Sequence, residues 1–442
     1  MPAAQFMTVV RHPLVERIFD ARRRSDDLFD IVCLDSLYAR PIPERHRIIF
    51  YLGHLEAFDW NLLHDNVFGL KSFRPEFDRL FAFGIDPVGG GLPSDQSSDW
   101  PSLEIVRDYV REIRDALDQK LTDFESTLPE SSRAFLDTLL NVAIEHRLMH
   151  VETLAYMLHQ LPLDQKIRSK DSSAVLATPV AHRMIQIPAG ETTLGLSRHA
   201  GIFGWDNEYE AHTVQVPAFE IDQYMVTNQQ YLEFMEAGGY ERHSFWSDED
   251  WAWKSANTVS QPVFWHKFND QWRYRGMFEE FPLPLDWPAY VSQAEASAFA
   301  RWAGKSLPTE QEWHRAAYGN REGVENYYPW GAQSPSANRG NFDFHRWDPA
   351  PVNAFPDGKS AFGVEGMLGN GWEWTSSVFA PFNGFEPFPF YRGYSADFFD
   401  GKHFVMKGGS PRTAACMLRP TFRNWFQAHY QYVYTGFRCV KR

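Results

Sequence analysis

The amino-acid pattern changes abruptly between residues 166 and 178, and this change restricts the fold more than any other feature of the sequence. Up to about Leu161, apolar residues recur at helical spacing in four segments. Beyond the change, short alternating runs such as residues 184–188 are separated by Gly, Pro, Asn and Asp, as in strands joined by turns. The sequence therefore predicts two domains of different class, joined by a polar linker at residues 166–178.

Residues 1–165 are predicted to form a bundle of four helices. The expected helices cover residues 15–38, 45–63, 102–119 and 131–160, and Pro41 and Pro43 separate the first two. Between the second and third lies a Gly/Pro-rich excursion, residues 83–95, which is too long for a simple bundle turn. Loops of that length in compact domains are often functional.

Residues 179–442 are predicted to form an α+β domain with little regular structure. Only two helices are expected there: residues 227–237, capped by Thr227 or Asn228, and residues 292–303, capped by Ser292. Aromatic residues make up 16% of the chain, including 16 Trp and 36 Phe, which suits loops that are held in place by large side chains.

Charge and cysteine content narrow the class of partner. The formal net charge of -14 and the lack of a long basic run argue against nucleic acid or an anionic membrane surface. Cys33, Cys416 and Cys439 are too few and too scattered for a disulfide framework, which fits a reducing compartment. No secretory signal pattern opens the chain, and no apolar run approaches the ~20 residues that span a bilayer. We expect a cytoplasmic protein that acts on small molecules.

A pair of histidines in the fourth predicted helix suggests a metal site. His146 and His150 stand four residues apart, so both side chains project from one helical face. Two neutral imidazoles can chelate a divalent transition metal, but a site needs a further ligand. His54 in the second predicted helix is the best candidate, because facing side chains of antiparallel helices commonly build such sites. Ordinary surface or core histidines stay open as the alternative.

The second domain carries a series of motifs in a fixed order. They include Tyr328-Pro-Trp-Gly331, Gly366-Met-Leu-Gly-Asn-Gly-Trp-Glu-Trp-Thr375 and Gly436-Phe-Arg-Cys439. On these motifs the domain resembles the formylglycine-generating-enzyme-like domain (sulfatase-modifying factor), a variant of the C-type lectin fold. That fold alone does not determine a function. Formylglycine-generating enzymes bind copper through a close pair of cysteines, whereas Cys416 and Cys439 are far apart in sequence, which disfavours that activity.

The combination of the two domains is more specific. A helical domain of the DinB type carrying His54, His146 and His150, followed by this lectin-like domain, resembles the non-haem iron sulfoxide synthases of ergothioneine and ovothiol biosynthesis. The resemblance covers nearly the whole chain. It implies that the three histidines hold iron(II), with open positions for a thiolate and dioxygen. It also implies oxidative carbon–sulfur bond formation, in a cleft where the two domains meet.

The resemblance also implies substrate-binding residues. In Arg423-Asn-Trp425, Asn424 and Trp425 match residues that line the pocket of the imidazole substrate in that family. Trp425 would then pack on a trimethylammonium group, with plain core packing as the alternative. Phe426 stands where some ergothioneine-type enzymes carry an aspartate, and Met149 stands where they place a glutamine. Both departures leave the thiol substrate open.

Two further roles are left open by the sequence: the proton donor and the group that orients a ligand histidine. Bacterial members of the family place a tyrosine after Trp-Glu-Trp-Thr, but the only aromatic residues at 376–385 here are phenylalanines. Tyr51, Tyr430 and Tyr432 are the candidates from elsewhere. Glu152 is expected either to orient a ligand histidine or to face solvent.

The first functional hypothesis is a sulfoxide synthase that joins hercynine, the trimethylated betaine of histidine, to cysteine or γ-glutamylcysteine. The alternatives are ovothiol-type chemistry on histidine, a selenium-transferring relative, a thiol dioxygenase, and a non-catalytic lectin-like binding module. Related lectin-like domains often bind calcium through Asn, Asp and backbone carbonyls, so residues 179–442 are also a candidate calcium-binding region, although no loop there is an unmistakable site.

Overall fold

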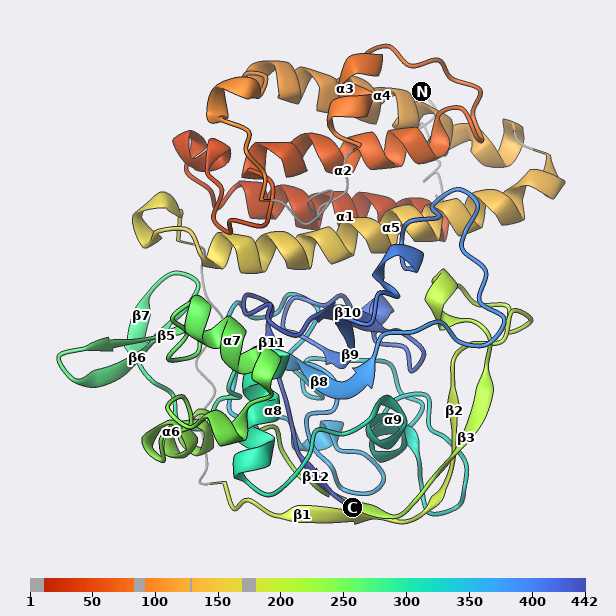
Figure 1. Ribbon diagram of the computed structural model, residues 1–442. Coiled ribbons are helices and arrows are strands. Elements are labelled where there is room, and N and C mark those ends of the chain that lie inside the picture. The colour runs from red at the N-terminus through yellow and green to blue at the C-terminus, as the bar shows by residue number, and fades with distance from the viewer. Residues whose placement is uncertain (1–11, 83–91, 128, 169–179) are drawn as a thin grey trace, which may run out of the picture. The chain divides into compact units, whose positions relative to one another are not determined.

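A computed structural model describes residues 12–82, 92–127, 129–168 and 180–442. Contacts divide the chain into two compact units, residues 1–168 and 169–442 (Figure 1). Most of the predicted excursion at residues 83–95 and of the predicted linker at residues 166–178 lies outside the described residues. Within the described part, no helix combines the length and the apolarity that a membrane crossing requires.

Four long helices make up most of the described first unit, which confirms the predicted helical class. They are α1 (Pro13–Phe29), α2 (Ile48–Leu63), α4 (Leu103–Thr127) and α5 (Glu130–His159), with the short α3 (Pro75–Leu80) between α2 and α4 (Figure 1).

The predicted first helix, residues 15–38, is wrong at its end. Helix α1 stops at Phe29, and a separate 3-10 turn covers Leu34–Tyr38. Between them the backbone is bonded to the segment after α5: the amide of Ile167 donates to the carbonyl of Ile31, and that of Cys33 to the carbonyl of Gln165. Long-range backbone pairing therefore replaces the helical hydrogen bonds there.

Helices α2 and α5 are buried on nearly every side. In α2, 13 of the 16 residues are buried, and in α5 the burial is almost continuous from Leu136 to His159. A helix surrounded in this way has to satisfy its polar side chains inside the protein. His54, Glu56 and Asp59 of α2 and His146 and Arg147 of α5 are such side chains.

Short strands joined by long loops make up the described second unit. The largest sheet has the order β10-β9-β8-β11, in which β11 is parallel to β8 and the other pairs are antiparallel. Smaller sheets have the orders β1-β4-β12, β2-β3 and β5-β6-β7. The strands are β1 (Met184–Ile187), β2 (Gly190–Leu194), β3 (His212–Val216), β4 (Phe219–Asp222), β5 (Trp265–Phe268), β6 (Gln271–Arg275), β7 (Glu280–Pro282), β8 (Gly371–Val378), β9 (His403–Gly409), β10 (Asn424–Gln427), β11 (Thr435–Gly436) and β12 (Val440–Lys441).

The prediction of only two helices in this unit is wrong. Helices α6 (Asn228–Glu236) and α8 (Gln293–Trp302) are capped by Thr227 and Ser292, as predicted. Two further helices form, α7 (Asp248–Ala256) and α9 (Glu310–Tyr318). Each has only nine residues, too short for a clear apolar period, yet Thr309 and Glu312 form a capping box at the start of α9. The capping-box pattern Thr309-Glu-Gln-Glu312 can be recognised in the sequence.

Helix α9 packs into the core of the second unit. Its Trp313 lies with Phe342, Leu368 and strand residues such as Ile221 in one buried cluster. The indole of Trp313 donates to Glu373, which also accepts from the fully buried Arg438. The predicted α+β class of this unit is confirmed.

Candidate metal centre

The three histidines named from the sequence come together in the first unit. His54 projects from α2, and His146 and His150 project from α5. The Nε2 atom of His150 lies 3.2 Å from Nε2 of His54 and 3.1 Å from Nε2 of His146. The possible ligand atoms of the three side chains all lie within 4.8 Å of one another, and each residue is at most 5% exposed.

The protonation of His54 follows from its partner. Its Nδ1 atom lies 2.7 Å from the carbonyl oxygen of Phe81, the residue that ends α3. A carbonyl oxygen only accepts hydrogen bonds, so Nδ1 carries the proton, and in the neutral ring Nε2 keeps its lone pair for a metal. The group that orients His54 is therefore a backbone carbonyl, which the sequence analysis did not predict.

The contact between Phe81 and His54 depends on Gly53 and Asp78. A Cβ atom at position 53 would lie 2.5 Å from the ring of Phe81, so only glycine lets this ring pack directly against α2. Asp78 of α3 accepts hydrogen bonds from Trp60 of α2 at 3.2 Å and from Tyr109 of α4 at 2.7 Å. These contacts hold α3 where its last carbonyl meets the imidazole.

Aromatic rings enclose the histidines. The ring of Phe58 stacks on His146 with centroids 3.4 Å apart, and Phe50 stacks on His54 at 4.9 Å. Both phenylalanines stand four residues from His54, one on each side, so α2 itself builds these walls. The apolar surroundings keep the imidazoles neutral: burial lowers the pKa of His54 to about 4 and moves the pKa values of His146 and His150 well below their ordinary range.

This donor set fits a divalent transition metal. A metal with bonds of about 2.1 Å to two imidazole nitrogens at right angles separates these nitrogens by about 3.0 Å. The two Nε2 separations of 3.1 and 3.2 Å match that value. Among the residues that the structure describes, this triad is the one group of three or more His, Cys, Asp or Glu side chains able to hold a metal ion.

Comparisons with known proteins agree with this site. Residues 172–442 match the family model of the sulfatase-modifying factor enzyme 1-like domain. The chain is 34% identical over 447 residues to hercynine oxygenase from Mycolicibacterium smegmatis, covering 98% of this chain and 99% of that protein. It is 36% identical over 437 residues to hercynine oxygenase from Mycolicibacterium thermoresistibile, covering 97% and 95%. This chain belongs to the hercynine oxygenase family.

Membership in the hercynine oxygenase family confirms the predicted enzyme class, a non-haem iron oxidoreductase. A formylglycine-generating enzyme from Mycobacterium tuberculosis is 28% identical over 301 residues, which cover 58% of this chain and 97% of that enzyme. The hercynine oxygenases match the chain over a much larger share, 97–98% of its length.

Of the candidate proton donors, Tyr51 lies in the same unit as the three histidines. Its side chain is fully buried, and its ring centroid is 5.8 Å from that of His150. Tyr430 and Tyr432 belong to the second unit, where Tyr430 stacks on Phe426 and contacts Tyr432 edge-on.

The predicted substrate residues Asn424 and Trp425 lie on β10, at the end of the largest sheet. Alternation along a strand directs Asn424 and Phe426 to one face and Trp425 to the other. The ring of Trp425 stacks on Phe379 with centroids 4.2 Å apart and an angle of 6°. One face of Trp425 is therefore covered by a phenylalanine of the segment where bacterial family members place a tyrosine.

Two predicted residues of α5 lie close in sequence to the ligands. Met149, directly before His150, is half-buried, and Glu152 is buried. The prediction that Glu152 faces solvent is therefore wrong, and its role in orienting a ligand histidine stays a prediction.

Sequence reasoning did not find the residues that surround the ligands. Phe50 and Phe58 carried a usable signal, because they stand four residues before and after His54. Arg147 also carried a usable signal, because it is a charged residue inside an apolar helical stretch. The carbonyl of Phe81 carried none, because its approach to His54 depends on the packing of α3.

Proposed function

We propose that this protein joins the imidazole ring of hercynine to the sulfur of a thiol, with dioxygen as the oxidant. The balanced reaction consumes the imidazole C–H, the thiol and O₂, and gives the carbon–sulfur sulfoxide and water. Cysteine and γ-glutamylcysteine are the proposed thiols. One observation carries the proposal: three neutral imidazole Nε2 atoms converge in a chain that matches hercynine oxygenases along nearly its full length.

In this proposal His54, His146 and His150 hold iron(II), which supplies the binding positions and the electrons for the activation of dioxygen. The protein contributes the order of the site. The carbonyl of Phe81 keeps the lone pair of His54 directed at the metal. Burial of the three ligands excludes water, which disfavours simple oxidation of the thiol.

Tyr51 is our proposed proton donor. It is the one candidate of the three whose ring lies beside a ligand histidine within the same unit. Its hydroxyl would supply the proton that the reduced oxygen needs when water is formed. Phe379 cannot do so, because its ring has no hydroxyl group and is stacked on Trp425.

Asn424 and Trp425 are proposed to bind the imidazole substrate at β10, the edge strand of the largest sheet, where both residues are partly exposed. Phe379, Tyr394 and Phe398 already contact the ring of Trp425, so a trimethylammonium group would bind at the part of the indole that they leave exposed. Met149 and Phe426 are proposed to contribute to thiol selection. Calcium binding in residues 179–442 stays a prediction.

The test is dioxygen consumption by protein reconstituted anaerobically with iron(II). Hercynine or histidine is offered in turn with cysteine or γ-glutamylcysteine, and the products are identified by mass. The proposal expects a carbon–sulfur sulfoxide with hercynine and one of the thiols, and none from chelator-treated protein. A sulfoxide only with histidine would support ovothiol-type chemistry instead.

The missing tyrosine after Trp-Glu-Trp-Thr favours a second candidate, a thiol dioxygenase. Residues 376–385 contain Phe379, Phe382 and Phe385 and no tyrosine. In this candidate both oxygen atoms go to the thiol sulfur and the imidazole ring is not modified. Oxygen uptake that yields only the sulfinic acid would establish it and reject the first proposal.

A further inference from the structure

Arg147 joins the two helices that carry the histidines. It stands on α5 directly after His146 and three residues before His150, and it is 1% exposed. Its guanidinium group donates to the carbonyl of Leu55 at 2.9 Å, and Leu55 directly follows His54 on α2. The side chain therefore bonds one ligand-bearing helix to the backbone of the other, next to ligands on both sides.

Two carboxylates of α2 complete this contact. Arg147 donates to Glu56 at 2.9 Å and to Asp59 at 2.6 Å, and both acceptors are as buried as the arginine. A guanidinium group is planar and has five donors in a fixed geometry. Three acceptors at positions 55, 56 and 59 of α2 therefore restrict both sliding and rotation of α5 against α2.

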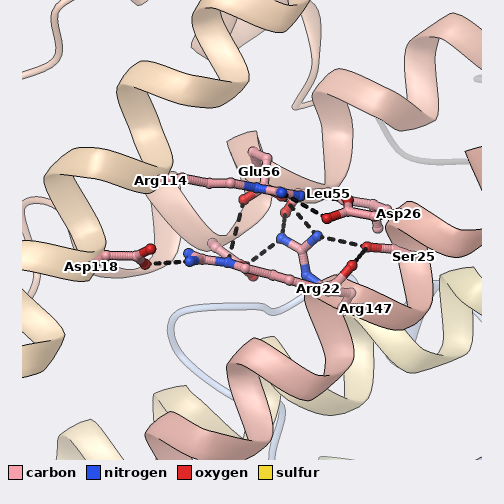
Figure 2. A network of polar contacts seen from close by, with 9 residues as sticks. Arg22, Ser25, Asp26, Leu55, Glu56, Arg114, Asp118 and Arg147 are labelled. Carbon is pink, nitrogen blue, oxygen red and sulfur yellow. Dashed lines mark hydrogen bonds and ion pairs between the residues drawn. The ribbon is translucent and has the colours of Figure 1, made fainter.

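The carboxylate of Glu56 is in turn held by α1 and α4. Figure 2 shows Arg114 of α4 and Arg22 of α1 on either side of Glu56, with Arg147 reaching the same carboxylate and Ser25. Arg114 also pairs with Asp26, and Arg22 with Asp118. Glu56 is therefore held from two further helices, most closely by Arg114.

A metal centre needs this restriction more than a hydrophobic core does. Ligand distances in a metal site are kept within about 0.2 Å, whereas apolar side chains tolerate small shifts of one helix along another. His54 comes from α2 and the other two ligands come from α5, so every such shift changes the spacing of His54 from them.

We propose that Arg147 is a positioning residue of the iron centre: its bonds to Leu55, Glu56 and Asp59 fix α5 against α2 and so set the distance between His54 and the pair His146 and His150. This inference rests on the proposed iron site. Under this inference, the ion pairs of Arg147 with Glu56 and Asp59 help to set the geometry of the metal site, in addition to stabilising the packing of the helices.

The test compares three variants of the full chain. Arg147→Met removes the bonds across α2 and α5, and Arg147→Lys keeps the charge but not the planar fork. Arg22→Met is the matched control, because it removes an equally buried arginine of the same cluster that joins α1 to Glu56 and Asp118. Each is titrated with Co(II), whose visible absorption reports ligand geometry, and its thermal unfolding is recorded without metal.

For Arg147→Met we expect Co(II) binding about 10- to 100-fold weaker than in the wild type, with an altered visible spectrum, and for Arg147→Lys a smaller change of the same kind. Arg22→Met should lower the melting temperature and leave both Co(II) readouts as in the wild type. A folded Arg147→Met or Arg147→Lys protein with wild-type affinity and spectrum overturns the inference, as does an equal loss in Arg22→Met. Failure of the wild type to bind Co(II) would instead refute the proposed iron site.

Discussion

Buried arginines serve different purposes in the two units. In the helical unit, Arg147 joins helices whose backbone hydrogen bonds are already formed, so it selects one packing of complete elements. In the second unit, Arg438 donates to the carbonyls of Asp222, Gln223 and Glu365 as well as to Glu373. There one side chain joins the backbone at the end of β4 to the backbone of a distant loop.

This difference predicts different failures. Burial raises the pKa of Glu56, but the guanidinium groups of Arg147, Arg22 and Arg114 outweigh burial and hold that pKa at about 2, so Glu56 is charged at neutral pH. Loss of Arg147, which joins the two ligand-bearing helices, should disturb helix spacing and the metal site. Loss of Arg438 should unfold loops. The Arg147–Glu56 and Arg438–Glu373 pairs are equally buried, so burial alone does not reveal whether an ion pair positions a functional site or stabilises the fold.

The largest effect is expected from His150→Ala. Its Nε2 atom lies within 3.2 Å of both other ligand nitrogens, so its removal leaves two nitrogens that no longer surround a metal. Iron content should fall to background, and oxygen uptake should fall on the order of 100-fold or more. The control is His159→Ala, a buried histidine of the same helix outside the triad, which should keep its iron. Iron retained by His150→Ala would contradict the site.

Arg438→Met tests the fold-supporting role. Both Arg438 and Glu373 are fully buried, and removing the arginine leaves an uncompensated charge and removes its hydrogen bonds to three backbone carbonyls. The free energy of unfolding of the second unit should fall by about 3–5 kcal/mol, measured by chemical denaturation. Arg301→Met, an exposed arginine of α8, should change it by about 0.5 kcal/mol or less. Equal losses in both variants would show that the buried ion pair of Arg438 does not support the fold of the second unit more than an exposed arginine does.

Gly53→Ala sharpens the comparison within the helical unit. Alanine favours helix over glycine by about 1 kcal/mol, but its Cβ would meet the ring of Phe81 at 2.5 Å and displace the carbonyl that orients His54. Metal affinity should fall about 10-fold or more even though helix propensity rises.

The double variant Gly53→Ala, Phe81→Val is the matched control for that substitution. Valine lacks the ring atoms that the new Cβ would meet, so α3 can return and affinity should recover in part. Unchanged affinity in the single variant, or no recovery in the double one, would show that the carbonyl of Phe81 does not orient His54.

The smallest effect is expected at Glu312, in the first turn of α9. Burial raises the pKa of Glu312, but hydrogen bonds from Arg442 and from the backbone of Thr309 outweigh it and hold the pKa below its ordinary value. A carboxyl group whose folded-state pKa is lowered stabilises the fold above its unfolded pKa of about 4.3, and this stabilisation is lost as pH falls further. Glu312→Gln should cost about 0.5–1 kcal/mol at pH 7 and progressively less as the pH falls below about 4.3, in unfolding experiments at pH 7 and pH 3. A difference that is undiminished at pH 3 would exclude the ion pair as its cause.

Local patterns in the sequence identified the elements that carry the site. The spacing of His146 and His150 predicted one helical face, and the apolar helix around His54 predicted the facing one, because helical geometry depends on neighbouring residues. The same reasoning missed α7 and α9, where nine residues give too short a period, and placed the end of α1 too late, where pairing with residues 165–167 overrides local preference.

The sequence by itself determined the helical origin of each of the three histidines and the change of fold class after Leu161, since these follow from spacing along the chain, and it named the histidines as candidate ligands. Only the tertiary structure decided how the donors are held: the carbonyl of Phe81 against His54, the space that Gly53 leaves for a ring, and the bonds of Arg147 to Leu55, Glu56 and Asp59. These contacts join residues far apart in sequence, up to 92 positions for Arg147 and Leu55, and such distances are set by packing.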